Sequence, residues 1–122
     1  MLNVLAVGVG GCIGSVLRYL IGRIPLQEPF VFPVRTLAIN VIGCVVIGLI
    51  AAAGSRYASA HPHLLLFLKV GLCGGFTTFS TFALETADLM KGGHTGAAFL
   101  YVLLSVLAGV AVIFAVEAFS AP

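Results

Sequence analysis

Gly71-Leu-Cys-Gly-Gly-Phe-Thr-Thr-Phe-Ser-Thr-Phe82 is the stretch that decides the fold, because it places three glycines and four hydroxyl residues in the middle of a membrane-length apolar segment. In hydrocarbon an unpaired backbone group is costly, so glycine-rich and hydroxyl-rich backbone is tolerated at membrane depth only where it faces protein, an ion or water. A plain bilayer anchor has no use for such residues. The stretch is therefore predicted to be a permeation or binding element.

The composition of the chain indicates that the bilayer is its solvent. Of 122 residues, 61% are hydrophobic and 8% are charged, whereas about a quarter of a typical globular chain is charged. The few charges stand mostly at the ends of apolar runs, so we expect an all-α integral membrane protein in which residues 1–122 form a single transmembrane domain. The six Lys and Arg residues are dispersed, so nucleic acid is not an expected partner.

Polar, proline and glycine residues divide the chain into four apolar segments, each near or above the roughly 20 residues that cross a bilayer core. They run from Leu2 to about Ile24, from about Pro33 to Gly54, from about His63 to Met90 and from about Thr95 to Phe119. The first segment lacks the basic start of a signal peptide, so we take it as a mature helix. Four transmembrane helices are predicted.

The third segment is too long for one unbroken crossing. Its glycines and the hydroxyl cluster behind them predict a break, as in other membrane proteins whose discontinuous helices form ion sites.

The basic residues predict a weak preference for one orientation in the membrane. In the four-span arrangement Arg23, Arg35 and Lys91 fall on one side, while Arg56, Lys69 and the amino terminus fall on the other. A small protein that inserts both ways can pair with its inverted copy, so we expect a dimer. The spacings Gly10/Gly14 and Gly71/Gly75 are available for close helix contact.

Three blocks of the chain resemble the Fluc (CrcB) family of fluoride channels. Gly10-Gly-Cys-Ile-Gly-Ser-Val-Leu-Arg-Tyr19 is similar to the glycine-rich first helix of the family, and Thr36-Leu-Ala-Ile-Asn-Val-Ile-Gly43 is similar to its Thr-Leu-x-x-Asn block. Gly71 to Phe82, with Glu85 just beyond, is similar to its broken third helix. One departure is Arg35, which stands where the family usually has glycine and would add a cation at a pore mouth.

The resemblance implies an antiparallel, dual-topology homodimer in the cell inner membrane, with two fluoride pores at the subunit interfaces. It also implies a structural sodium ion that is not transported. The expected function is passive, fluoride-specific export that reduces fluoride toxicity, without enzymatic activity, and the expected partners are fluoride, an inverted copy and the lipid bilayer.

Residue by residue, the resemblance carries the family's roles onto two sets of positions. The sodium ligands match Gly74 and Thr77, through backbone carbonyls that the broken helix would expose, with glycine at 74 permitting the necessary backbone geometry. The fluoride pore and its polar track match Asn40, Phe79, Phe82, Ser80, Thr81, Tyr101, Ser105 and Glu85.

The chemistry of these residues suits fluoride independently of the resemblance. Fluoride is small and tightly hydrated, so a selective path must replace water with hydrogen-bond donors such as amides, hydroxyls and phenols. An aromatic ring is positive at its edge, so Phe79 and Phe82, on one helical face at i, i+3, can solvate an anion without holding it too firmly.

Plainer interpretations exist for several of these residues. The two phenylalanines could face lipid or fill a core, and Asn40 could be a hydrogen-bonding residue between helices. Arg18 could extend to the membrane interface or line an anion vestibule. Glu85 is an intramembrane acid whose charge is awkward beside an anion unless it is protonated or paired, so we expect a supporting role.

Other function classes fit less well. The three cysteines are odd in number and lack metal-binding spacing, so they are expected to be small buried hydrophobic residues. No nucleophile, base or metal constellation supports an enzyme. The main alternative is a small dual-topology multidrug-type exporter, whose mechanism needs a membrane-embedded acid in the first helix. This first segment has none.

Overall fold

The apolar segments form helices because their backbone groups must find partners within the chain in the absence of water. The computed structural model describes residues 1–25, 31–57 and 61–120, with backbone only at 55–57. The helices are α1 (Leu2–Gly22), α2 (Val34–Tyr57), α3 (Pro62–Leu65), the π-helix η1 (Leu66–Cys73), α4 (Gly74–Phe76), α5 (Phe79–Lys91) and α6 (Thr95–Ser120). The stretch Pro25-Leu-Gln-Glu-Pro29, whose composition predicts a turn after the first span, lies outside the described residues from position 26 on.

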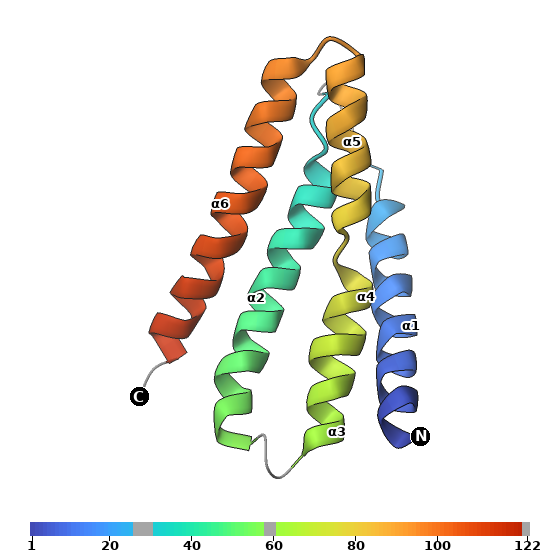
Figure 1. The fold of residues 1–122 in the computed structure, drawn as a ribbon, viewed down its shortest axis with the longest axis vertical. Helices are drawn as coiled ribbons and strands as arrows, with labels where there is room; N and C mark the ends of the chain where they lie inside the picture. The colour runs from blue at the N-terminus through green and yellow to red at the C-terminus, as the bar shows by residue number, and fades with distance from the viewer. Residues whose placement is uncertain (26–30, 58–60, 121–122) are drawn as a thin grey trace.

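Four spans are long and apolar enough to cross a membrane, which confirms the predicted helical membrane fold. They are Leu2–Gly22, Val34–Gly54, Pro62–Lys91 and Thr95–Ser120. Figure 1 shows the spans side by side, with both chain termini at one end and the α5 to α6 turn at the other. The chain is therefore a multi-pass membrane protein.

The third span is broken within the predicted stretch, and the break lies in its hydroxyl cluster, at Thr77 and Thr78, directly after the glycines. Thr77 (φ −81°, ψ 160°) and Thr78 (φ −150°, ψ 114°) are extended, a conformation that β-branched residues favour. Gly74 has ordinary helical torsion angles (φ −64°, ψ −36°). The expectation that glycine supplies a special backbone geometry at position 74 was therefore wrong.

The glycines serve instead to bring two spans into backbone contact. A Cβ atom added at Gly10 would lie 2.9 Å from the Leu72 nitrogen, and one at Gly71 would lie 2.8 Å from the Val7 carbonyl oxygen. Gly14 and Gly75 make equally close approaches along the same seam. The predicted close helix contact is confirmed, but it joins α1 to the first half of the third span within one chain.

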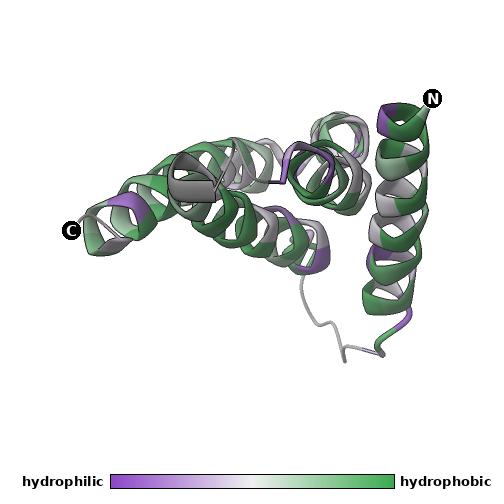
Figure 2. Cartoon of the chain, turned by 90° about the horizontal axis from the view of Figure 1, so that it is seen from below, coloured by the Kyte–Doolittle hydropathy of each residue, from purple (hydrophilic) through white to green (hydrophobic). Residues whose placement is uncertain are grey.

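The interior of the chain is small, and most of its apolar side chains face outward. Among the described residues the buried hydrophobic positions are Ile39, Cys73, Leu89, Ala98 and Tyr101. Figure 2 shows that apolar residues make up most of the length of the spans and that α6 diverges from the others toward the C-terminus; many of the large apolar side chains are exposed. This surface is suited to lipid and to further protein contact.

Candidate functional site

The break in the third span is held by the side chain of Asn40 from α2. The side-chain nitrogen of Asn40 (Nδ2) donates to the backbone carbonyl oxygen of Thr78 at 3.2 Å. The backbone N–H of Thr78 donates to the side-chain oxygen of Asn40 (Oδ1) at 2.9 Å. This amide replaces the helical partners that the extended Thr78 has lost. Asn40 therefore does join two helices, and its second amide hydrogen is left over for another acceptor.

The break also diverts the N–H groups that would normally satisfy the Gly74 and Thr77 carbonyls. In a continuous helix these donors would come from Thr78 and Thr81, four residues further on. The Thr78 N–H goes to Asn40, and the Thr81 N–H goes to the Thr78 hydroxyl at 3.2 Å. The carbonyl oxygens of Gly74 and Thr77, predicted to bind sodium, are therefore the ones whose helical N–H donors bind other acceptors.

A third carbonyl at the break, that of Gly75, accepts hydrogen bonds from α1. The Arg18 Nε–H donates to it at 3.2 Å, and the Ser15 hydroxyl lies at 3.5 Å. Arg18 is part-buried here and places a cation at the carboxyl end of the first half-helix, where a positive charge is favourable. Ser15 is a site residue that was not predicted from the sequence, although it stands one turn before Arg18 on the same helix.

The two predicted phenylalanines begin a row of aromatic rings. The Phe79 and Phe82 ring centroids lie 5.7 Å apart, and Phe82 continues to Tyr101 at 5.1 Å. Phe32, which the sequence analysis did not select, meets Tyr101 edge-on at 5.4 Å. Tyr101 is fully buried, whereas Phe79 is 79% exposed, so the row runs from the interior to an open face of the chain.

Glu85 is paired with two hydroxyl groups rather than isolated. The Thr36 hydroxyl donates to one carboxylate oxygen at 2.8 Å, and the Tyr101 phenol donates to the other at 2.7 Å. Both donors are drawn from buried positions, so the carboxylate joins α2, α5 and α6. Thr36 was not predicted as a site residue, but it precedes Asn40 by one helical turn and so shares its face.

A cavity of about 470 Å³ lies beside the break, between α2, the third span and α6. Four predicted pore residues line it, together with both predicted sodium positions: Asn40, Phe79, Phe82, Ser105, Gly74 and Thr77. The Ser105 hydroxyl oxygen is buried and has no hydrogen-bond partner among the described residues. Lys69 also lines this cavity; from the sequence it was expected only to influence the orientation of the chain in the membrane. We call this space the break cavity.

Ser80 and Thr81, the other predicted hydroxyls, gather at the start of α5. The Thr78 hydroxyl donates to the Thr81 hydroxyl at 2.9 Å and lies 3.5 Å from the Ser80 hydroxyl. The Thr78 hydroxyl also caps the amino end of α5 by accepting from the Thr81 N–H, and backbone N–H groups at such an end carry a partial positive charge. The amino end of α5 is therefore suited to an anion.

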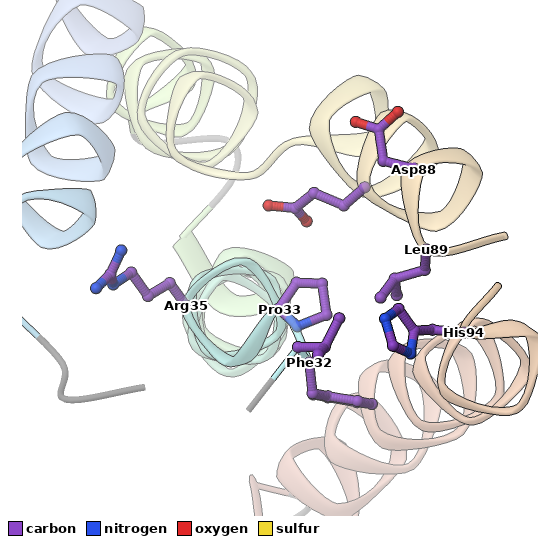
Figure 3. A pocket seen from close by; sticks show the side chains of 8 residues that line it. Phe32, Pro33, Arg35, Asp88, Leu89 and His94 are labelled. Atoms are coloured by element: carbon purple, nitrogen blue, oxygen red, sulfur yellow. The ribbon is translucent and has the colours of Figure 1, made fainter. Parts of the chain in front are cut away.

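A second pocket, of about 370 Å³, lies at the opposite end of the aromatic row. Its lining includes Phe32, Glu85, Asp88, Leu89 and His94. Arg35 contributes as well, but Figure 3 shows its side chain on the opposite side of α2 from Phe32 and Pro33. The predicted extra cation is thus directed away from the ring of Phe32.

The cysteines and acidic residues offer no cluster suited to a transition metal. Within residues 1–25, 31–57 and 61–120, no group of three or more His, Cys, Asp or Glu side chains could hold a metal ion. Cys73 is buried, and Cys44 is half-buried, whereas Cys12 is exposed. The expectation that all three are buried is therefore wrong for Cys12.

The sequence matches known proteins over nearly its whole length. The profile of the CrcB-like protein family, also described as camphor resistance (CrcB), matches residues 5–116. A Rhizobium etli protein is 45% identical over 117 residues, covering 94% of this chain and 93% of the relative. Relatives from Agrobacterium fabrum and Chlorobaculum tepidum are 42% and 44% identical over 117 residues, covering 94% and 93% of this chain and 93% and 90% of themselves. All three relatives are named fluoride-specific ion channel FluC.

Proposed function

Because the chain belongs to the family of CrcB-like proteins, we propose that it is a fluoride-specific channel through which fluoride leaves the cytoplasm passively. The relatives carry the fluoride-channel name, so the alternative of a small multidrug-type exporter is dropped. An ion channel needs no catalytic group, and none is assigned.

One observation carries the proposal most directly. The break cavity combines a leftover amide hydrogen on Asn40, an unpartnered buried hydroxyl on Ser105 and the rings of Phe79 and Phe82. Hydroxyl and amide donors can replace the water of a small anion, and ring edges can hold it weakly. A cavity that served only lipid or a core would have no reason to collect these groups.

The two half-helices provide opposite electrostatic ends at the break. The first half ends at Phe76, where free carbonyls favour a cation, and α5 begins at Phe79, where free N–H groups favour an anion. We assign fluoride to the amino end of α5, beside Asn40 and the phenylalanine pair. This placement solvates the ion without a full positive charge in contact with it, which favours release.

We assign the structural sodium ion to the carbonyls of Gly74 and Thr77. Their helical donors are engaged elsewhere, and oxygen ligands suit a hard cation. A Cβ atom added at Gly74 would meet nothing within 4 Å, so this face is open to a second copy. Bound sodium would supply a fixed positive charge that offsets the carbonyl dipoles; two carbonyls from each of two copies would complete the set.

The antiparallel dimer is proposed on the same open face. Phe79 is 79% exposed, so in a single chain the proposed fluoride path is open on the side of Phe79. A second copy would supply that wall and create two interfacial pores. Inverted pairing accords with the nearly even division of Lys and Arg between the ends of the spans.

Export would follow from ordinary cellular conditions in the inner membrane. Neutral hydrogen fluoride enters from acidic surroundings and ionises in the cytoplasm. The inside-negative potential, worth about 2.3 kcal/mol per charge per 100 mV, then drives the anion outward. No coupled ion or fuel is required.

The test is efflux from liposomes that contain the purified protein and either fluoride or chloride. We expect fluoride to leave and chloride to remain. Equal efflux of both ions, or of neither, refutes fluoride specificity. Replacing sodium by N-methylglucamine should lower fluoride flux and dimer stability together if sodium is structural. Unchanged flux and stability remove the sodium assignment but leave the channel intact.

A further inference from the structure

Lys69 is the charged residue among those that line the break cavity, and it has no part in the assignments of fluoride and sodium. It lies in η1, two turns before the break, and it lines the cavity together with Asn40, Thr77 and Ser105. Lys69 is exposed. No described carboxylate forms an ion pair with it, whereas Lys91, at the other end of the span, pairs with Asp88.

The surroundings of Lys69 argue against a purely lipid-facing position. Lys69 lies in the first part of the span Pro62–Lys91. A lysine inside a membrane helix is unfavourable, by about 2.5–3.5 kcal/mol at the helix centre on insertion scales and by less toward the ends. That penalty falls where the ammonium reaches water or polar groups, and the break cavity offers the Asn40 amide and the Ser105 hydroxyl. The cavity is otherwise apolar along Ile47, Val106 and Ile113, whereas Lys69 itself is exposed, so its field acts on ions that approach the cavity and is screened by salt.

We propose that Lys69 attracts small hydrated anions into the break cavity by its charge and so raises the rate of permeation; this inference rests on the proposed channel function. A lysine ammonium is a compact, strongly hydrated point charge on a flexible stem. It raises the local concentration of anions and lowers that of cations by its field. Because it precedes the phenylalanine pair by more than two helical turns, it attracts the ion without binding it at the narrow part of the path.

The inference predicts an effect that depends on charge and on ionic strength. Lys69→Met should lower the rate of fluoride efflux roughly tenfold at about 10 mM salt, the lower end of the range for electrostatic focusing. Lys69→Glu should lower it further, and Lys69→Arg should retain it. At about 1 M of an impermeant salt the Debye length falls to about 3 Å, so the difference between wild type and Lys69→Met should shrink to about twofold or less.

The matched control is Lys91→Met. Lys91 is also a lysine of the third span, but it stands at the other end with its side chain 75% exposed and paired with Asp88 at 3.7 Å. Its substitution should leave fluoride efflux unchanged at both salt concentrations. Equal loss in the two variants, or a Lys69→Met defect that persists undiminished at high salt, overturns the proposal.

A second experiment asks whether position 69 reaches water in the folded dimer. In a background with Cys12, Cys44 and Cys73 replaced by alanine, Lys69→Cys is treated with a methanethiosulfonate that carries either an ammonium or a sulfonate group. We expect the ammonium reagent to restore flux and the sulfonate reagent to reduce it further. If both reagents change flux equally, or neither reacts, Lys69 faces lipid or acts only in packing, and the proposal fails.

The two hypotheses fail in different ways. If the cysteine-free parent and the wild-type protein both transport no fluoride, the channel function is wrong. If both transport fluoride and position 69 shows no dependence on charge, the channel function stands and the role of Lys69 is removed.

Discussion

Replacing Asn40 by alanine tests whether the break depends on one side chain. The substitution removes both hydrogen bonds to Thr78, at 3.2 and 2.9 Å, and leaves an extended N–H and C=O without their partners. Interhelical hydrogen bonds in membranes contribute about 0.6–2 kcal/mol each, so two bonds correspond to a loss of about 1–4 kcal/mol in the free energy of unfolding.

The assay is unfolding in mixed micelles titrated with sodium dodecyl sulfate, followed by fluoride efflux at concentrations where the variant remains folded. Asn3→Ala is the control, because Asn3 makes a single exposed contact of 2.9 Å with the His63 ring. We expect a small effect on stability and none on flux for Asn3→Ala, and a loss of both for Asn40→Ala. Indistinguishable unfolding curves for the two variants would refute the claim that Asn40 holds the break.

Four further substitutions test other parts of the site. Gly75→Ala places a methyl group 3.0 Å from the Gly11 Cα atom and should lower the free energy of unfolding by about 1–3 kcal/mol. Gly8→Ala is the control and should not lower it, because nothing lies within 4 Å of the added methyl group. Equal melting temperatures of the two variants would refute the close packing of α1 against the third span. Phe79→Ile and Phe82→Ile should each cut fluoride flux strongly while gel filtration still detects the dimer, and normal flux in both would remove the ring-edge mechanism. Thr36→Val deletes the 2.8 Å bond to Glu85 and should reduce flux in wild type but not in a Glu85→Leu background, which lacks the acceptor. Additive losses would contradict coupling through that carboxylate.

The sequence predicted the spans closely because hydrophobic length alone defines them. The fourth span was expected at Thr95 to Phe119 and runs from Thr95 to Ser120. The break was harder to locate, since glycines and threonines stand next to each other and either type can end a helix. The glycines turned out to be needed for close packing against α1, and the extended torsion angles fell on the β-branched pair.

Which donors are already engaged could not be predicted from residue types. Tyr101 and Asn40 were both expected to serve the fluoride path, because each carries a suitable hydrogen. The structure directs the Tyr101 hydroxyl to Glu85 and one Asn40 hydrogen to Thr78. Such pairings depend on partners 16 and 38 residues away, and no local pattern encodes them.

The pairings divide the polar groups into those that hold the break open and those that remain for an ion. Arg18, Ser15 and the Asn40 amide, through its oxygen and one N–H, satisfy backbone groups at the break. Thr36 and Tyr101 satisfy Glu85. The donors left over in the break cavity are the second Asn40 hydrogen and the Ser105 hydroxyl, beside two phenylalanine rings. A small set of neutral donors favours an ion that gains much from each hydrogen bond. The net attraction of the anion into the cavity then comes from a more distant charge, such as that of Lys69.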